Sequence, residues 1–595
     1  MLSLVTLDTP WHVECHRRSV TVSARRLRAR LREHFGLEAF RPGQEETIRA
    51  LLAGQDVLAV LPTGAGKSLV FQLAAQLLPG VTIVVSPLLA LMKDQVDSLE
   101  ARGVEVGVVN SAVGAGEAEV ALERAEDEDD TTKLLYVTPE RFQNAEFMAR
   151  AKGMDVSLLV VDEAHCISQW GHSFRPAYLG LGRVAQQLGR PALLALTATA
   201  TPWVRKDIAE RLGMRSPKVV VRGSDRPNLF LEVRRVEDEQ HDRRELERLL
   251  TGEHGTLRYD EHPDAADGVD VADQLRDAMM GSGIVYCATT RAAQETAQWL
   301  QGWGITADYY HGQRKKADRE RVQDQFMSGA VRVIAATNAF GLGVDKPDVR
   351  FVIHRDVPAS VEEYYQEAGR AGRDGELARC TLIYRPGDLG RTAFLAGSGR
   401  LTREEVAAAR PGLLKQRAGS QEKMEAASGL GRADFARLVE ALKAAGLLRE
   451  RRRRLELLVD DFDPKAVPLD AEERRQAYEA SRVEMVRGYA DVDACRRRYL
   501  LNYFGEDYEA DACGRCDNDL RAVALAGDET EIPEKAACGG DALVAIGEQV
   551  EHTAFGPGTV QRVEEKAMTV LFENAGYKKL ALGALHDPAL MKKVA

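Results

Sequence analysis

The chain of 595 residues has no apolar run that approaches the length of a membrane span, and it has little cysteine. Eight cysteines in so long a chain, four of them scattered, do not make a disulfide framework, so the cytosol is the expected compartment. Residues 1–30 are rich in arginine but lack the apolar core of a secretory signal, and we expect an N-terminal extension there. These absences favour a packed, cytoplasmic protein that makes no membrane contact. The length of the chain predicts several domains.

The net charge of −11 argues at first against a polyanionic partner. The charges are unevenly spread, however, because arginine is concentrated at 449–454 and 496–498, while acid is concentrated at 123–130 and 237–239. Binding depends on where the cations lie rather than on their sum, so the sequence permits a basic track on an acidic protein.

An apolar run that ends at Leu61 is followed by two glycines, a lysine and a serine, which is the order of a phosphate-binding loop. Such a loop leaves backbone N–H groups free to hold phosphate oxygens, and the helix that follows adds its dipole. Lys67 would reach the β- and γ-phosphates of a nucleotide, and Ser68 would hold Mg²⁺. Leu61 replaces the first glycine of the usual pattern. The expected nucleotide-binding residues are Thr63, Gly64, Ala65, Gly66, Lys67 and Ser68.

A second apolar run, residues 158–161, ends in the two carboxylates of Asp162 and Glu163. Asp162 would bind the metal ion, and Glu163 would orient or deprotonate the attacking water. The plain structural alternative is a glycine turn and a strand with an acidic end. Because the two elements occur together and in the expected order, we interpret them as a nucleoside-triphosphate-hydrolysing core.

Short apolar runs alternate with helical stretches in two parts of the chain, which favours an α/β fold with two tandem lobes, each a parallel sheet with flanking helices. We expect the first lobe over residues 31–225 and the second over 226–398, with an acidic linker and insertion at about 237–280. Strands of the first lobe are expected at 57–61, 82–85, 133–137, 158–161 and 193–197. Those of the second lobe are expected at 283–287, 331–335, 351–354 and 381–384.

Beyond residue 398 the alternation of short apolar runs and helical stretches ends. Residues 399–462 are helical and end in an arginine-rich hairpin, which favours a winged-helix-like segment; an amphipathic linker with a solvated arginine turn is the alternative. A linker at 523–545 leads to residues 546–595, where turn and strand signals predict a small β-barrel. The apolar face of the helical segment comprises Phe435, Leu438, Val439 and Leu442.

Three cysteines lie in the spacing of a metal site. Cys513 and Cys516 form a C-x₂-C pair, and Cys495 precedes them just before a helical run. This pattern indicates a structural Zn²⁺ site within a helical zinc-binding module at 463–522. Thiols without a metal are the alternative.

Four further motifs lie around these elements. They are Phe-Arg-Pro-Gly-Gln at 40–44, Cys-Ile-Ser-Gln-Trp-Gly-His-Ser-Phe-Arg-Pro at 166–176, Thr-Ala-Thr at 197–199 and Gln-Glu-Ala-Gly-Arg-Ala-Gly-Arg-Asp at 366–374. Together the motifs closely resemble the RecQ family of superfamily-2 DNA helicases, over residues 31 to about 398 and again over 495–519.

The resemblance implies two RecA-like lobes and an ATP- and Mg²⁺-dependent helicase that moves 3′ to 5′ on single-stranded DNA. It implies unwinding of tailed or forked duplexes in DNA repair or recombination, and a nucleoid-associated location if the source is bacterial.

The expected nucleotide contacts come from both lobes. Gln44 supplies an amide that can donate to and accept from an adenine, and Arg41 can stack on the base. An arginine delivered from the other lobe accelerates phosphoryl transfer by about 10³–10⁵. We assign that part to Arg373, with Arg370 on the phosphates or the acidic motif and Gln366 beside the nucleotide. Surface salt bridges of the two arginines are the alternative.

The segment 166–176 resembles the family's aromatic-rich loop, which couples DNA contact to hydrolysis. Trp170 and Phe174 would stack on bases, at about 1–3 kcal/mol each, or else pack in the core. His172 and Arg175 would touch phosphate or the nucleotide site. The remaining expected DNA contacts, which would position a strand without reading its sequence, are Lys93, Gln95, Arg141, Arg451, Arg452 and Arg453.

The chain departs from the family at the fourth zinc ligand, where the family has a cysteine and this chain has Asp519. A carboxylate can also bind zinc, so the expected site is Cys₃Asp, with Asp517 or Cys538 as alternatives to Asp519. The expected zinc ligands are Cys495, Cys513, Cys516 and Asp519.

Two departures concern the accessory segments. The winged-helix candidate precedes the zinc module instead of following it, and its arginine-rich tip lacks an aromatic wedge, which favours phosphate tracking over base-pair splitting. The C-terminal segment resembles the small barrel of superfamily-1 repair helicases and would imply a protein partner; an inert surface module is the alternative. The missing wedge leaves open a translocase that does not separate strands, and an RNA helicase is a further alternative. A non-enzymatic scaffold is disfavoured because the catalytic set is complete.

Overall fold

The structure is a computed structural model that describes most of the chain. Seven of the expected site residues lie outside the described residues: Thr63, Trp170, His172, Phe174, Arg452, Arg453 and the alternative ligand Cys538. Within the described part, no helix has the length and apolar character needed to span a membrane. The described residues are 20, 22–62, 64–87, 89–110, 113–127, 133–168, 175–223, 225–252, 271–341, 346–389, 401–451, 454–467, 470–506, 508, 510–528, 544, 548–563, 567–572, 575–587 and 590–593.

The first lobe is a seven-stranded parallel sheet in the order β3-β4-β2-β5-β6-β1-β7. Its strands are β1 (Val57–Val60), β2 (Val81–Val85), β3 (Val106–Val109), β4 (Leu134–Val137), β5 (Val156–Val161), β6 (Ala192–Thr197) and β7 (Lys218–Val221). All five expected strands are present, and β3 and β7 are additional. Because β5, β6 and β1 are neighbours, the loops that follow them meet at one edge of the sheet.

Helices cover both faces of this sheet, and apolar side chains of the strands point to a core on either side. The helices are α1 (Ala24–Phe35), α2 (Gln44–Leu52), α3 (Lys67–Ala75), α4 (Leu89–Glu100), α5 (Ala115–Glu126), α6 (Ala145–Gly153), α7 (Leu181–Gln187) and α8 (Pro202–Leu212). Short 3₁₀ helices are η1 (Pro139–Gln143), η2 (Ala164–Ile167) and η3 (Pro176–Gly180).

The second lobe is a six-stranded parallel sheet in the order β10-β11-β9-β12-β13-β8. The strands are β8 (Leu229–Arg235), β9 (Ser282–Tyr286), β10 (Ala307–Tyr310), β11 (Val333–Ala336), β12 (Val349–His354) and β13 (Ala378–Tyr384). The helices are α9 (Glu239–Thr251), α10 (Val271–Met280), α11 (Thr290–Gly302), α12 (Lys316–Met327) and α13 (Val361–Ala368). The expected acidic linker and insertion is therefore partly wrong, since α9 and α10 are packed helices of this lobe, with Leu246 and Leu275 fully buried.

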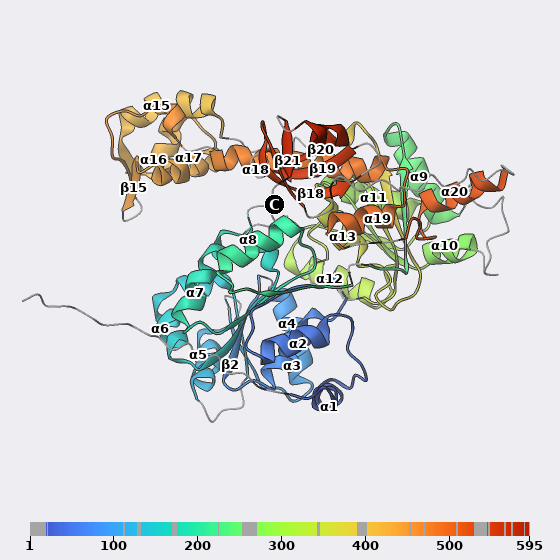
Figure 1. The fold of residues 1–595 in the computed structure, drawn as a ribbon, viewed down its shortest axis with the longest axis horizontal. Coiled ribbons are helices and arrows are strands. Elements are labelled where there is room, and N and C mark those ends of the chain that lie inside the picture. Colours follow the sequence, from blue (N-terminus) through green and yellow to red (C-terminus); the bar gives the residue numbers. More distant parts are fainter. Residues whose placement is uncertain are drawn as a thin grey trace, which may run out of the picture.

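Residues 401–467 form three helices and a small antiparallel sheet around their own core. The helices are α15 (Arg403–Gln416), α16 (Gln421–Ser428) and α17 (Arg432–Ala444). The strands β14 (Ala418–Ser420), β15 (Leu448–Arg451) and β16 (Arg454–Leu457) pair in the order β14-β16-β15. Phe435, Leu438 and Leu442 are fully buried here, as the helical periodicity predicted. Figure 1 shows this segment projecting beyond the lobes at one end of the helix that follows it.

That helix, α18 (Asp470–Asp491), leads back to the second lobe, where α19 (Arg496–Tyr503) and α20 (Asp517–Asp528) pack. The second lobe gains an edge contact here, because Leu231 of β8 pairs with Cys516 in a parallel bridge. The Leu231 N–H donates to the Arg515 carbonyl at 3.2 Å, and the Val233 N–H donates to Asp517 Oδ2 at 3.2 Å. The module that holds the three cysteines is thus attached to the edge strand of the second sheet.

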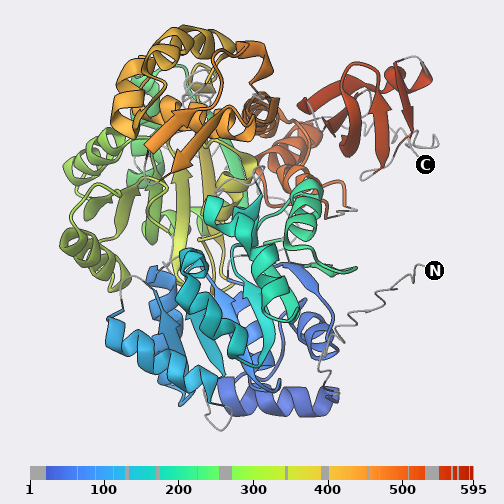
Figure 2. The same ribbon diagram turned by 90° about the vertical axis from the view of Figure 1, so that its left-hand side faces the viewer.

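The C-terminal segment is an antiparallel sheet in the order β20-β19-β18-β17-β21, visible as a separate red unit in Figure 2. Its strands are β17 (Gln549–His552), β18 (Gly556–Val563), β19 (Ala567–Phe572), β20 (Gly576–Ala581) and β21 (Met591–Lys593). Tyr577 of β20 packs on Tyr478 of α18 and on Tyr503 of α19, with ring centroids 5.9 and 5.8 Å apart. These buried aromatic contacts anchor the sheet to the helices beside the second lobe.

Candidate active site between the two lobes

The phosphate-binding loop connects β1 to α3 as the sequence predicted, and its backbone is shaped by glycine. Gly64 and Gly66 have φ angles of 83° and 70°, a left-handed conformation that side chains with a Cβ rarely adopt. Helix α3 begins at Lys67, so the N–H groups of its first turn point into the loop. The loop therefore presents the backbone donors and the helix N-terminus that a phosphate group requires.

Gln44 supports this loop from the start of α2. The buried side-chain amide donates to the Ala65 and Gly66 carbonyls at 2.8 and 3.1 Å and accepts from the Arg41 N–H at 2.9 Å. The Arg41 guanidinium donates to the Gly64 carbonyl. Both residues thus hold the loop itself, a role that the sequence did not predict, while their contacts with an adenine remain predictions.

Asp162 and Glu163 lie directly after β5, opposite the loop. Burial lowers the pKa of Lys67, whereas the charges of Glu163 and Asp162 act to raise it, so the ammonium group lies near both carboxylates. Burial and the neighbouring Glu163 raise the pKa of Asp162. Glu163 has a φ of 48°, which is strained for a residue other than glycine and is typical of functional sites.

His165 of η2 is a site residue to which the sequence reasoning gave no role. Its Nδ1 atom lies 2.9 Å from Thr197 Oγ1 and 3.3 Å from Glu163 Oε2. Thr197 in turn donates to the Thr199 carbonyl at 3.1 Å. Burial lowers the pKa of His165 to about 3, so the ring is neutral. It hydrogen-bonds to Thr197 of the Thr-Ala-Thr segment and lies beside Glu163 of the acidic motif.

The two arginines of the second lobe face the same site. A Cβ atom on Gly64 would lie 3.5 Å from Cγ of Arg373, so the Arg373 side chain passes directly over the phosphate-binding loop. The buried Arg370 donates to the Gly341 carbonyl, and the charges of both arginines act on the pKa of Lys67. Gln366, half-buried on α13, lies in the same helix-to-loop segment. Both lobes therefore contribute to one charged site.

The expected DNA contacts are only partly described. Arg175 donates to the Pro87 carbonyl at 3.0 Å and so connects the aromatic-rich loop to the segment that follows β2. Arg141 lies in η1, and its buried Nε has no hydrogen-bond partner among the described residues. Gln95 donates to Ser68 Oγ at 2.9 Å, which places its side chain at the nucleotide site. Lys93 is on α4, but its side chain is outside the described set.

Arg451 is exposed at the end of β15 and pairs in register with Arg454 of β16. Arg454 is exposed as well, so both arginines that flank the tip of the hairpin face solvent. Next to it Arg449 is also exposed, but its charge is offset by Glu456, 2.7 Å away.

Cys495, Cys513, Cys516 and Asp519 converge as the sequence predicted. One donor atom from each lies within 4.8 Å of all the others, which fits a tetrahedral Zn²⁺ ion with three thiolates and one carboxylate. Asp517, the alternative carboxylate ligand, is instead paired with the buried Arg496, whose Nη2 lies 2.9 Å from Asp517 Oδ2. Asp519 Oδ2 accepts from the Cys513 and Gly514 N–H groups at 2.6 and 3.0 Å, which orients the carboxylate toward the thiols.

A phosphate-binding loop, paired carboxylates and facing arginines on two parallel-sheet lobes define a nucleotide-driven helicase motor. Three family models match the chain in the same order: the DEAD/DEAH box helicase model over 41–207, the helicase conserved C-terminal domain over 269–375 and the RecQ zinc-binding model over 449–520. These matches cover both lobes and the cysteine module.

Named relatives agree with these models. The probable ATP-dependent DNA helicase RecS of Bacillus subtilis is 34% identical over 518 residues, covering 85% of this chain and 95% of RecS. The ATP-dependent DNA helicase RecQ of the same organism is 33% identical over 502 residues, 84% of this chain and 68% of that protein. The ATP-dependent DNA helicase Q5 of Rattus norvegicus is 42% identical over 380 residues, 62% of this chain but 37% of Q5. This chain belongs to the RecQ family of ATP-dependent DNA helicases.

Proposed function

We propose that this chain hydrolyses ATP to move 3′ to 5′ along single-stranded DNA and to separate duplex strands, in DNA repair or recombination. The single observation that carries the proposal is the shared site: Lys67, Asp162 and Glu163 come from one lobe, and Arg370 and Arg373 face them from the other. A site divided between two lobes changes when the lobes move, so hydrolysis and movement along a strand are coupled.

In the proposed mechanism Lys67 binds the β- and γ-phosphates, and Ser68 and Asp162 would hold Mg²⁺. The ion would supply charge neutralisation at the phosphates when it is bound. Glu163 orients the attacking water and accepts its proton, because it is the carboxylate next to Asp162 and its buried Oε2 atom, 3.3 Å from His165 Nδ1, is left without a hydrogen-bond partner among the described residues. Arg373 stabilises the charge that develops on the transferred phosphoryl group, and Arg370 assists from the buried side.

We further propose that residues 401–467 act as a winged helix whose hairpin tip follows the phosphate backbone. Three helices and a three-stranded sheet support this, together with the exposed side chains of Arg451 and Arg454. Arginines bind phosphate without reading sequence, so this contact would suit a moving motor. For the C-terminal sheet we propose a protein partner, because Tyr577 of β20 anchors one edge of the sheet and Figure 2 shows the sheet extending away from the lobes.

The test of the main proposal is ATP hydrolysis with and without single-stranded DNA, together with unwinding of matched duplexes that carry a 3′ or a 5′ tail. We expect DNA to stimulate hydrolysis and only the 3′-tailed duplex to be unwound. Stimulated hydrolysis without unwinding of either duplex would instead identify a translocase. Stimulation by single-stranded RNA and not by DNA would contradict the proposal.

Asp519→Ala should weaken zinc binding by at least about 100-fold, because it removes one of four ligands that are held in place by hydrogen bonds. We expect a fall in the melting temperature of about 5–10 °C, since zinc binding contributes to folding free energy. Zinc content by metal analysis and thermal unfolding measure the two effects. Asp493→Ala, at an exposed carboxylate of the same module, is the control. An Asp519→Ala protein that keeps one zinc ion and its melting temperature would remove Asp519 from the ligand set.

A further inference from the structure

We propose that Arg226, in the segment that joins the two lobes, is a positioning residue for the loop that carries Arg370 and Arg373. Its guanidinium donates to three backbone carbonyls of that loop. Nη1 reaches Gly369 at 3.0 Å, and Nη2 reaches Ala371 and Gly372, each at 2.8 Å. One side chain thus fixes the backbone on both sides of Arg370 and just before Arg373.

Asn228 extends this contact by two further hydrogen bonds. Its side-chain amide donates to the Gly372 and Glu376 carbonyls, both at 2.8 Å. Gly372 has a φ of 57°, and a Cβ atom there would lie 2.4 Å from the Asn228 amide nitrogen. The lobe-joining segment and the loop are therefore so close that only glycine fits between them. Gly372 also donates its N–H to the Val349 carbonyl at 2.8 Å, which fixes the loop to β12.

Arg226 binds backbone carbonyls and, among the described residues, does not act as a partner in an ordinary ion pair. Its guanidinium donates to main-chain carbonyls, and Asp225, the carboxylate next to it in sequence, pairs with Arg497 instead. Burial lowers the pKa of Arg226, yet a guanidinium stays charged at neutral pH, so its charge is satisfied by the carbonyl dipoles. A planar fork with five N–H donors can hold several carbonyls at once, which a lysine ammonium on a flexible stem does less well.

The zinc-binding module holds the other side of the same segment. Arg497, two residues after the zinc ligand Cys495, donates to Asp225 at 2.7 Å and to the Leu229 carbonyl at 2.7 Å. Arg497 is buried, so this ion pair is shielded from solvent on its side. Residues 225–229 are thus held by the module on one side and hold the arginine loop on the other.

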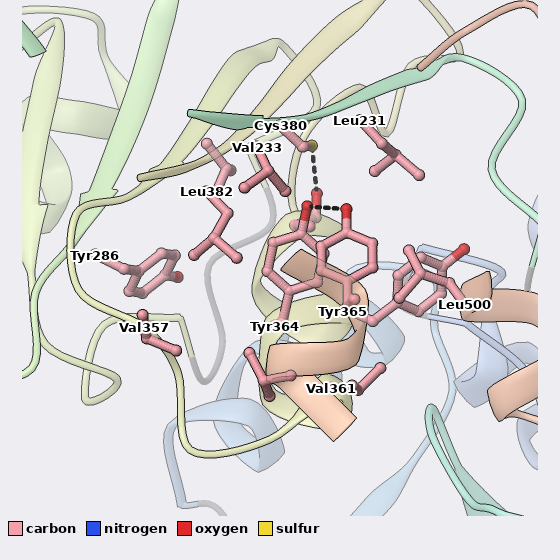
Figure 3. Close-up of a cluster of buried hydrophobic side chains, with 14 of the residues drawn as sticks. Leu231, Val233, Tyr286, Val357, Val361, Tyr364, Tyr365, Cys380, Leu382 and Leu500 are labelled. Atoms are coloured by element: carbon pink, nitrogen blue, oxygen red, sulfur yellow. Dashed lines mark hydrogen bonds between the residues drawn. The ribbon is translucent and has the colours of Figure 1, made fainter. Parts of the chain in front are cut away.

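Helix α13, which leads into the arginine loop, packs against the same module. Figure 3 shows Tyr365 of α13 beside Leu500 of α19, and the Tyr365 ring lies 5.3 Å from that of Phe504. The Cys380 thiol donates to the Ala368 carbonyl at 3.6 Å, drawn as a dashed line, and so fixes the last residue of the helix. The loop therefore starts from a rigid helix end and is held along its length by Arg226.

This inference rests on the proposed role of Arg373 in hydrolysis, and the experiment separates the two. ATP hydrolysis is measured at saturating single-stranded DNA for Arg226→Ala, Arg373→Ala and the double variant. We expect Arg226→Ala to lower kcat by about 10–100-fold, because a displacement of about 1 Å of a catalytic group has effects of this size. KM for ATP and the Kd for single-stranded DNA should change by less than about threefold, since the phosphate-binding loop and the DNA contacts are unchanged.

The double variant decides how Arg226 acts. If it acts only through the arginine loop, the double variant should be no slower than Arg373→Ala alone, within about threefold. A double variant slowed by the product of the two single effects would overturn the proposal, as would an unchanged kcat in Arg226→Ala. If Arg373→Ala keeps its rate while Arg226→Ala loses it, the assignment of Arg373 fails and not that of Arg226.

Two further variants guard against a simple loss of folding. Arg226→Lys keeps the charge but loses the fork, so we expect a kcat between those of wild type and Arg226→Ala. Asn228→Ala removes two hydrogen bonds and should lower kcat by about threefold to tenfold with an unchanged KM. Arg291→Ala, at an exposed arginine of the same lobe that pairs with Glu295 of its own helix, is the matched control and should keep full activity. A lower melting temperature without any change in kcat in all variants would show a purely structural role.

Discussion

Arg373→Ala is expected to reduce the DNA-stimulated rate of ATP hydrolysis by about 10³–10⁵-fold. The Arg373 side chain passes over Gly64 of the phosphate-binding loop, where charge accumulates on the transferred phosphoryl group. An arginine there acts mainly on the transition state, so kcat should fall while nucleotide binding changes little. Steady-state hydrolysis and binding of a fluorescent ATP analogue measure the two quantities separately.

The controls for Arg373→Ala distinguish loss of charge from loss of structure. Arg373→Lys keeps a positive charge without the planar fork and should recover only part of the rate. Arg291→Ala removes an exposed arginine from the same lobe and should leave hydrolysis unchanged. A loss of less than about tenfold in a folded Arg373→Ala protein would contradict the assignment.

Lys67→Ala is expected to lower ATP hydrolysis by at least about 10²–10³-fold while binding of single-stranded DNA stays within about twofold. Lys67 lies near the Asp162 and Glu163 carboxylates, and the charges of Arg373 and Arg370 of the other lobe also act on its pKa. Its loss therefore removes the charge that binds the phosphates and changes nothing in the expected DNA track. Hydrolysis assays and fluorescence anisotropy with labelled single-stranded DNA measure the two effects.

Lys152→Ala, at an exposed position on α6 of the same lobe, is the matched control for Lys67→Ala and should behave as wild type. Removing Lys67 takes a neighbouring positive charge away from two carboxylates, so the melting temperature is measured in parallel. An equal loss of hydrolysis and DNA binding in a folded Lys67→Ala protein would refute the assignment of Lys67 to the phosphates.

The sequence predicted most of the apolar strands, although it missed β3 and β7, and it also missed the polar strand β8. Buried strands such as β1, β5 and β9 read as short apolar runs, whereas β8 contains Glu232 and two arginines. Glu232 is fully buried because Arg379 and Thr381 of the neighbouring strand donate to it at 2.7 and 2.6 Å. A pattern of hydrophobicity cannot reveal such a pair, since its partner is about 150 residues away along the chain.

The candidate site shows the same division. The phosphate-binding loop, the paired carboxylates and the zinc ligands were predicted, because each depends on close spacing within a segment or on a residue type with few other uses. The contact of Gln95 with Ser68 and the hydrogen bonds of Arg226 were not predicted. Arg226 donates to backbone carbonyls, which every residue has, so nothing in the sequence indicates which ones it reaches.

The attachment of the zinc-binding module to β8 has a consequence for synthesis of the protein. The edge of the second sheet is completed by residues 515–517, and Asp517 follows Val233 by 284 residues. While a ribosome makes the intervening chain, β8 remains a strand edge with unused N–H and C=O groups, which is a template for pairing between chains. Any product that ends before residue 515 keeps that edge permanently. Incomplete chains should therefore aggregate, whereas in the finished protein the cysteine module covers the edge of β8 and prevents such pairing.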